Sequence, residues 1–267
     1  MLHKLFRQSL KPFSRVLHEK AYKEWLRLFD FFKDENIKYP TEVKAMGYEW
    51  QVHHGATFIN QFESIFIDQI YKFNSNTKSP IIIDCGANMG TSVLYFKWLY
   101  PESKITAFEP DQLIFEILNH NISSNKLGHV ELINKAVWIS NQDMFFNSNE
   151  AQSGKLTQDE RNKRVSCVHL KNFLQNFKHI DFLKLDIEGA ELPVLQDISS
   201  ELHRIEHIFI EYHSVIEQPQ KLSHLLAILE QAGFRYFIGG NHSKSPFTNR
   251  VVEDEMDLTL DIFATKS

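Results

Sequence analysis

An acidic residue and two closely spaced glycines follow an apolar run in the first third of the chain. The stretch reads IIIDCGANMG, with Asp84 ahead of Gly86 and Gly90. Three β-branched residues before the acid predict a buried strand, and the glycines predict a tight turn into a helix. In sheets with helices on both faces, ligands bind at such turns, outside the carboxyl ends of the strands. The stretch therefore predicts a binding site for a nucleotide-like cofactor.

Two kinds of ligand suit a turn of this type, a dinucleotide and a cationic nucleoside. A dinucleotide pyrophosphate favours the pattern G-x-G-x-x-G, which cannot be placed on DCGANMG, and Asp84 would repel a phosphate. S-adenosylmethionine carries a sulfonium and an ammonium group, which a carboxylate attracts. Asn88, after Ala87, stands where a glycine would fit, and asparagine tolerates a left-handed backbone. The turn therefore predicts S-adenosylmethionine.

A second acid, Glu109, follows the glycines by about 20 residues in the stretch AFEPD. It ends a predicted strand, where its carboxylate can accept hydrogen bonds from both ribose hydroxyls. A third strand predicted over 130–138 brings its own residues to the same edge of the sheet. The predicted cofactor site comprises Asp84, Gly86, Ala87, Asn88, Gly90, Glu109, Pro110, Ala136, Val137 and Asp186.

Three residues near the ends of later predicted strands are candidates for catalysis. Asp186 ends IDFLKLD, Glu188 follows in the turn, and His213 ends IFIEYH. Methyl transfer to a hydroxyl depends on positioning and on a base that removes the proton. Histidine has an ordinary pKa near neutrality, whereas Asp186 ends the strand predicted to lie beside the cofactor turn. The sequence does not choose between them. We expect Asp186 to act near the methyl group and His213 to contact the acceptor hydroxyl.

A divalent ion could assist the reaction by lowering the pKa of a bound hydroxyl. Asp186 and Glu188 could supply two oxygen ligands, but no third acidic ligand is evident, and no H-E-x-x-H pattern occurs. We therefore expect no required metal. Lys184 alternates with Asp186 along its strand and could pair with an acid in the site. Glu188 and Glu191 also stand at a helix start, where the helix dipole alone favours carboxylates.

Strands and helices alternate from residue 81 onward, which predicts a mainly parallel sheet covered on both faces. The last two predicted strands, FRYFIGG and LTLDIFATK, have no helix between them and predict an antiparallel pair at one edge. The segment 140–163 is polar and predicted to be irregular. A polar run over 74–80 predicts a boundary between a mainly helical N-terminal cap, 1–75, and the main domain, 76–267.

The cap contains apolar residues at helical spacing over 13–32. A possible short hairpin follows later in the cap, around EWQVHHGATFI. The spacing predicts a helix that packs on its own domain. Docking of this helix on a membrane surface or a partner, including a second copy of the chain, stays open.

The composition of the chain excludes several classes of protein. Its 267 residues carry a formal net charge of −5, which argues against a generic nucleic-acid binder. No segment approaches the roughly 20 apolar residues of a membrane span, and the start lacks the apolar core of a secretory signal. Two cysteines, Cys85 and Cys167, are too few for a disulfide framework. They predict buried free thiols in a reducing compartment, so we expect a cytoplasmic protein.

The successive motifs resemble those of FkbM-type methyltransferases. The resemblance is carried by IIIDCGANMGTSVLYF, AFEPD, NKAVW, DFLKLDIEGAELPVL and IFIEYH, over roughly half the chain, and LKLDIEGAE is the most specific piece. It implies a Rossmann-like class I methyltransferase fold, α/β with seven strands of which the last is antiparallel. It also implies S-adenosylmethionine-dependent methyl transfer, mostly to hydroxyl oxygens of sugars or secondary metabolites, with S-adenosylhomocysteine as the product.

Three other functions stay open. One is N-methylation of a small amine, although the chain lacks the N/D-P-P-Y/F tetrapeptide of many nitrogen methylases. The others are a nicotinamide-dependent oxidoreductase and a non-catalytic protein that binds the cofactor. The acceptor is not identified, because the cap and the segment 140–163, which we expect to line its pocket, match no known pattern.

Overall fold

The computed structural model describes residues 12–34, 36–148, 154–157, 162–216, 218–239 and 256–266. The chain forms two compact units, Met1–Lys72 and Phe73–Ser267. No helix among the described residues is long and apolar enough to cross a membrane. Both cysteines, Cys85 and Cys167, are free and buried.

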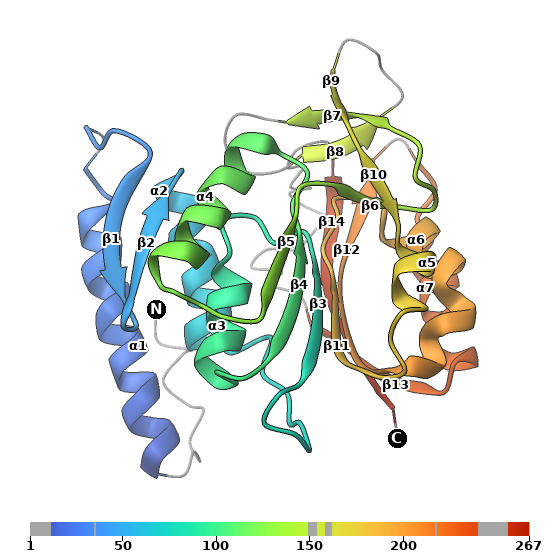
Figure 1. The fold of residues 1–267 in the computed structure, drawn as a ribbon, viewed down its shortest axis with the longest axis horizontal. Helices are drawn as coiled ribbons and strands as arrows, with labels where there is room; N and C mark the ends of the chain where they lie inside the picture. Colours follow the sequence, from blue (N-terminus) through green and yellow to red (C-terminus); the bar gives the residue numbers. More distant parts are fainter. Residues whose placement is uncertain are drawn as a thin grey trace, which may run out of the picture. The chain divides into compact units, whose positions relative to one another are not determined.

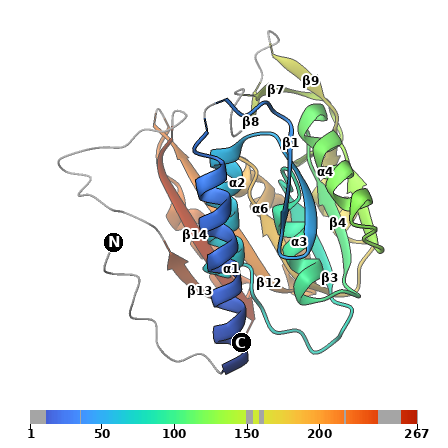
Figure 2. The same ribbon diagram turned by 90° about the vertical axis from the view of Figure 1, so that its left-hand side faces the viewer.

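The N-terminal unit consists of helices around a two-stranded hairpin. Its elements are α1 (Pro12–Phe31), β1 (Thr41–Ala45), β2 (Tyr48–Val52), α2 (Gly55–Phe62) and the π-helix η2 (Glu63–Ile67). Helix α1 lies along α2 (Figure 2), and Phe32 packs edge-on against Phe58 with ring centroids 5.9 Å apart. Trp50, Phe58, Phe62 and Phe66 are buried and their rings contact one another in succession, so aromatic packing forms the core of this unit.

The hairpin lies earlier in the sequence than we predicted. Met46 and Gly47 connect its strands with φ values of 55° and 88°, which is the backbone of a type I′ turn. The residues HHGATFI start α2 instead, because the side chain of His54 accepts a hydrogen bond from the Thr57 N–H and caps the helix.

The second unit is built on a seven-stranded sheet (Figure 1) in the order β13-β14-β12-β11-β3-β4-β5. Strand β14 runs antiparallel to both neighbours, β12 and β13, and the other pairings are parallel. The seven-stranded sheet with one antiparallel strand confirms the predicted fold class. The strands are β3 (Ile81–Cys85), β4 (Lys104–Phe108), β5 (Val130–Ile133), β11 (Ile180–Leu185), β12 (Ile205–Val215), β13 (Phe234–Gly239) and β14 (Met256–Lys266).

Helices cover both faces of this sheet, with α3 and α4 on one side and α5, α6 and α7 on the other (Figure 1). All residues of β11 are buried, as expected for a central parallel strand with helices on both faces. The core between sheet and helices is aliphatic and includes Leu183, Leu195, Ile208 and Leu229. The helices are α3 (Thr91–Leu99), α4 (Gln112–Ser124), α5 (Leu170–Leu174), α6 (Glu191–Asp197), the 3-10 helix η3 (Ile198–Arg204) and α7 (Leu222–Gln231).

The third predicted strand, 130–138, is two strands in the structure. Strand β5 belongs to the main sheet, whereas β6 (Ala136–Trp138) pairs in parallel with β10 (Cys167–His169). The break falls at Asn134, whose side chain donates hydrogen bonds to the carbonyl oxygens of Glu109 and Pro110 at 2.8 and 3.2 Å. These contacts turn the chain away from the sheet after β5.

The segment 140–163 was wrongly predicted to be irregular. Its described residues include β7 (Met144–Ser148) and β8 (Gly154–Thr157), which form a small antiparallel sheet with β9 (Lys163–Val165). Residues 149–153 and 158–161 lie outside the described part of the chain.

Gly86 holds the turn after β3 close to the end of β11. The Asp186 N–H donates to the Cys85 carbonyl oxygen at 3.1 Å, and a Cβ built on Gly86 would lie 1.8 Å from the Asp186 carbonyl oxygen. Gly86 also has a φ of +89°, where side chains are disfavoured. A side chain at this position would separate the two central strands.

We therefore predict that Gly86→Ala lowers the free energy of unfolding by at least about 2 kcal/mol, since it combines overpacking with a strained backbone. Gly128→Ala is the matched control, because no atom lies within 4 Å of a Cβ built there. Urea denaturation of both variants measures the difference. Equal stability of the two would contradict the close packing at Gly86.

Candidate active site

The turn after β3 is a left-handed backbone tied to the neighbouring strand. Gly86, Asn88 and Gly90 have φ values of 89°, 48° and 92°, which confirms the left-handed conformation expected for Asn88. The N–H groups of Gly86 and Ala87 both donate to the Phe108 carbonyl oxygen, at 3.1 and 2.9 Å. The Asn88 side chain accepts a hydrogen bond from the next N–H, at 2.7 Å. The turn is therefore held in this conformation by its own hydrogen bonds and by those to β4.

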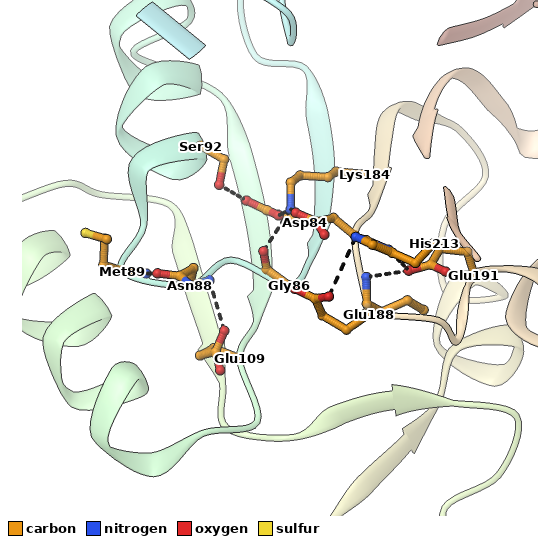
Figure 3. A network of polar contacts seen from close by, with 12 residues as sticks. Asp84, Gly86, Asn88, Met89, Ser92, Glu109, Lys184, Glu188, Glu191 and His213 are labelled. Atoms are coloured by element: carbon orange, nitrogen blue, oxygen red, sulfur yellow. Dashed lines mark hydrogen bonds and ion pairs between the residues drawn. The ribbon is translucent and has the colours of Figure 1, made fainter. Parts of the chain in front are cut away.

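Glu109 lies directly after β4, facing this turn (Figure 3). Its two carboxylate oxygens accept hydrogen bonds from the backbone N–H groups of Asn88 and Asp111, both at 2.9 Å. Burial raises the pKa of Glu109 to about 7, although these two hydrogen bonds oppose the shift. A buried carboxylate with remaining lone pairs can accept further hydrogen bonds from a diol such as ribose.

Asp84 lies deeper than the sequence suggested. Its side chain is fully buried, with one carboxylate oxygen bound to the Ser92 hydroxyl at 2.5 Å and the other 3.5 Å from the Lys184 ammonium. Burial raises the pKa of Asp84, and Lys184 and Ser92 counteract the shift. A side chain with no exposed surface cannot touch a ligand without first moving. The geometry gives Asp84 an indirect role, through the residues that it holds.

Lys184 joins the cofactor turn to the end of β11 (Figure 3). Its side chain is 2% exposed, and its ammonium donates to the Gly86 carbonyl oxygen at 2.8 Å and to the Asp186 carboxylate at 3.0 Å. The contact with Asp186 follows from the alternation of residues along the strand. The same ammonium also pairs with Asp84, which lies opposite Lys184 on the neighbouring strand β3. A single buried cation therefore bridges two acids and a carbonyl group of the turn.

The remaining residues of the predicted cofactor site lie beyond β4 and β5. Pro110 follows Glu109, and its carbonyl oxygen accepts a hydrogen bond from Asn134. Ala136 and Val137 are buried at the start of β6, outside the seven-stranded sheet. The prediction that they belong to a strand of the main sheet is therefore wrong. Sequence reasoning missed Asn134, which contacts the backbone of the predicted ribose site.

Glu191 orients His213 on the other side of the site. Its buried carboxylate accepts hydrogen bonds from the N–H groups of Ile187 and Gly189, each at 3.1 Å, and contacts His213 Nδ1 at 3.0 Å. The Nε2 of His213 therefore points away from Glu191, and it lies 3.6 Å from the Glu188 carboxylate. Glu191 therefore fixes the orientation of the His213 ring. The catalytic candidates Glu188 and His213 lie next to each other.

The neighbouring charges change the proton affinities of both residues. Burial lowers the pKa of His213, but the carboxylates of Glu191, Glu188 and Glu211 outweigh it and raise the pKa to about 10. The ordinary pKa of histidine, which favoured His213 as a base, therefore does not apply to His213 in the folded chain. Burial raises the pKa of Glu188 to about 7, although His213 lowers it. Of this pair, Glu188 is consequently the residue whose pKa lies near neutrality.

Two further acids, which sequence reasoning missed, lie beside this pair. Glu211 precedes His213 by two residues on β12, and Asp261 on β14 is its partner in the antiparallel register. Asp186 and burial raise the pKa of Glu211 well above its usual range, and burial and Asp186 raise that of Asp261 to about 6. The spacing of Glu211 and His213 in IEYH was a usable signal, because residues two apart share a strand face.

Comparisons with known proteins indicate the family of the chain. Residues 84–236 match the family model described as the methyltransferase FkbM domain. "Methyltransferase sdnD" of Sordaria araneosa is 30% identical over 220 residues, which cover 67% of this chain and 82% of that protein. "Methyltransferase 1" of Beauveria bassiana (strain ARSEF 2860) is 26% identical over 199 residues, 64% and 79% of the two chains. Among solved structures, M. jannaschii TYW2 in complex with AdoMet aligns with a TM-score of 0.44 and 13% identity, covering 85% of this chain and 86% of that one.

Substitutions at Asn88 test the conformation of the turn. We predict that Asn88→Gly keeps its affinity for S-adenosylhomocysteine within a few-fold, because glycine adopts a positive φ freely. Asn88→Val should weaken binding by at least about tenfold, because a β-branched side chain resists that conformation. Isothermal titration calorimetry measures both affinities. Indistinguishable affinities in the two variants would show that the left-handed turn is not required for binding.

The pKa of Glu109 predicts a pH-dependent affinity. If the ribose hydroxyls donate to the Glu109 carboxylate, the affinity for S-adenosylhomocysteine is full above pH 7. Below the pKa of about 7 it should fall by up to about tenfold per pH unit as Glu109 becomes protonated.

Calorimetry between about pH 5.5 and about pH 8.5 measures this profile, because that range spans the pKa of Glu109. Glu109→Gln should remove the slope and weaken binding at high pH by roughly 10- to 100-fold. Glu116→Gln, an exposed change on α4, should retain the wild-type profile. A slope that persists in Glu109→Gln would assign the titration to another group.

Proposed function

Because the chain belongs to the FkbM methyltransferase family and is an S-adenosylmethionine-dependent methyltransferase, we propose that it methylates a hydroxyl oxygen of a small molecule, such as a sugar or a secondary metabolite. The observation that carries the proposal is the position of Glu188, whose pKa of about 7 suits proton removal, beside His213 and Asp186. Oxygen acceptors need such a base, since a neutral hydroxyl is a weak nucleophile.

The residues around the turn fit the cofactor. S-adenosylmethionine supplies an electrophilic methyl group carried on a sulfonium. We propose that Glu109 accepts the ribose hydroxyls, because its carboxylate is buried and has lone pairs beyond those used by the N–H groups of Asn88 and Asp111. The backbone of residues 86–90 lines the same edge, held by Asp84 and Lys184 from beneath.

The acceptor side supplies the proton transfer and the positioning. Glu188 takes the proton of the acceptor hydroxyl, while Glu191 fixes the ring of His213 so that Nε2 faces the acceptor. Asp186 is held by Lys184 and helps to fix the end of β11 beside the cofactor. This assignment moves the base from Asp186, which the sequence favoured, to Glu188, because the Asp186 carboxylate is already paired with a cation.

An amine acceptor is the second candidate. Its support is the group of acids around His213, which would attract a protonated amine.

Two buried free cysteines support the reducing, cytoplasmic setting in which either reaction would run.

The test has two stages, cofactor and acceptor. Calorimetry with S-adenosylmethionine and with NADH should show binding of the first alone. Incubation with S-adenosylmethionine and matched alcohol and amine acceptors, analysed by mass spectrometry, should then show a gain of one methyl group on the alcohols. Methylation of the amines alone would establish the second candidate. Cofactor binding with no methylated product from any acceptor, and no S-adenosylhomocysteine released, would favour a non-catalytic binding protein.

Turnover as a function of pH tests the base. With saturating cofactor, which suppresses the titration of Glu109, kcat should rise with pH through about 7 and then level off, since Glu188 must be ionised. Glu188→Gln should lower kcat by roughly 100-fold and remove the inflection. Glu131→Gln, an exposed change on β5, is the control.

His213→Ala and Asp186→Asn complete this comparison. His213→Ala should leave cofactor affinity nearly intact and lower kcat, because His213 faces the acceptor. A loss in Asp186→Asn larger than that in Glu188→Gln, with the inflection kept in Glu188→Gln, would return the role of base to Asp186.

A further inference from the structure

We propose that Asp186, Glu211 and His213 form a binding site for a divalent cation such as Mg²⁺ or Mn²⁺. One donor atom from each of these residues lies within 4.8 Å of the other two. The residues come from the ends of adjacent parallel strands, since Asp186 follows β11 and the other two share a face of β12. Carboxylate oxygens and an imidazole that gives up its proton when the ion binds form a donor set that suits Mn²⁺ and, with more water, Mg²⁺.

The orientation of His213 is that of a metal ligand. Its side chain is 5% exposed, and Nδ1 is bound to Glu191, which is itself fixed by two backbone N–H groups. No hydrogen bond to Nε2 occurs within the described residues, and the Glu188 carboxylate, at 3.6 Å, lies beyond hydrogen-bond length. Metal-ligating histidines almost always bind a carboxylate or carbonyl group through the other ring nitrogen, which sets the direction of the ligand atom. Glu191 gives His213 this arrangement.

Glu211 provides an independent indication, because its carboxylate faces like charges. Asp261 is directly opposite on β14, and a carboxylate oxygen of Asp186 lies within 4.8 Å of one of Glu211. Like charges directly opposite across a sheet are destabilising. Within the described residues Glu211 has no hydrogen-bonded partner, and the nearby Lys184 already binds Asp84, Asp186 and a carbonyl oxygen. A divalent cation would supply the charge that balances these acids.

The size of the group suits a small cation after modest side-chain rotation. With ligands at about 2.1 Å, an octahedral ion holds donor atoms roughly 3 to 4 Å apart. Three protein ligands leave about three positions for water or for oxygen atoms of the acceptor. The expectation of no metal depended on a missing third acidic ligand, and Glu211 fills that place. The role of the cation in lowering the pKa of the acceptor hydroxyl rests on the proposed function, whereas its binding does not.

Titration of the full chain with MnCl₂, without cofactor or acceptor, tests the site. Electron paramagnetic resonance measures free Mn²⁺, and the wild type should bind one ion per chain. Glu211→Gln should weaken binding by at least about tenfold, since the loss of even an outer-shell partner costs about 10- to 100-fold. Glu206→Gln, an exposed change on the same strand, should bind as the wild type does.

Thermal unfolding separates loss of the site from loss of the fold. Glu211→Gln should not lower the Tm of the metal-free chain, because an amide replaces one of two acids that lie directly opposite each other on β12 and β14. Mn²⁺ should raise the Tm of the wild type and of Glu206→Gln but not that of Glu211→Gln. If Glu211→Gln does not fold, Asp186→Asn takes its place in the Mn²⁺ titration and should also weaken binding by at least about tenfold. Its metal-free Tm should fall, because Asp186→Asn removes a carboxylate partner of the buried Lys184.

Absence of Mn²⁺ binding in the wild type, or equal affinity in wild type and Glu211→Gln, would overturn the cation site. Either result leaves the proposed methyl transfer untouched, since neither cofactor nor acceptor is present. Conversely, Mn²⁺ binding that depends on Glu211, in a chain that methylates no acceptor, would support the site and count against the proposed function.

Discussion

The ammonium group of Lys184 is the contact on which both halves of the site depend. It lies between β3 and β11 and contacts Asp84, Asp186 and the carbonyl group of Gly86. Removal of one partner from a buried ion pair costs about 3–5 kcal/mol, because the other charge is left uncompensated. The Lys184 ammonium therefore holds both the cofactor turn and Asp186, which follows β11. A displacement of the turn is consequently coupled to a displacement of Asp186.

Two buried glutamates at the site differ in how fully their carboxylate oxygens are used by hydrogen bonds, and this difference separates a structural role from a chemical one. Glu191 receives N–H groups from the turn before its own helix and contacts His213, so its oxygens are already used. Glu109 has one backbone N–H on each oxygen, and burial raises its pKa to about 7. The same residue type thus fixes the orientation of a candidate catalytic side chain in one place and has lone pairs left for a ligand in the other.

Local patterns predicted the elements of the fold well, because strands buried on both faces are continuous apolar runs and the turn chemistry of residues 86–90 is encoded by its own residues. The break at Asn134 was not predictable, since it depends on hydrogen bonds to carbonyl groups that are distant in sequence. The same limit applied to His213. Its ordinary pKa follows from its residue type, whereas its pKa in the chain follows from the carboxylates that β11, β12 and α6 bring together. The position of Glu211 opposite Asp261 could not be predicted either, because it depends on the register in which the antiparallel strands β12 and β14 pair.

The two buried cysteines make the chain a convenient subject for site-specific labelling. Burial raises the pKa of the Cys85 thiol well above its usual value and that of Cys167 to about 11. Maleimide dyes react with thiolates, so both native thiols should stay unmodified in the folded chain. A cysteine at Leu113, an exposed position on α4 shortly after Glu109, would then carry a single fluorophore. Its emission would report events at the cofactor turn without removal of either native cysteine.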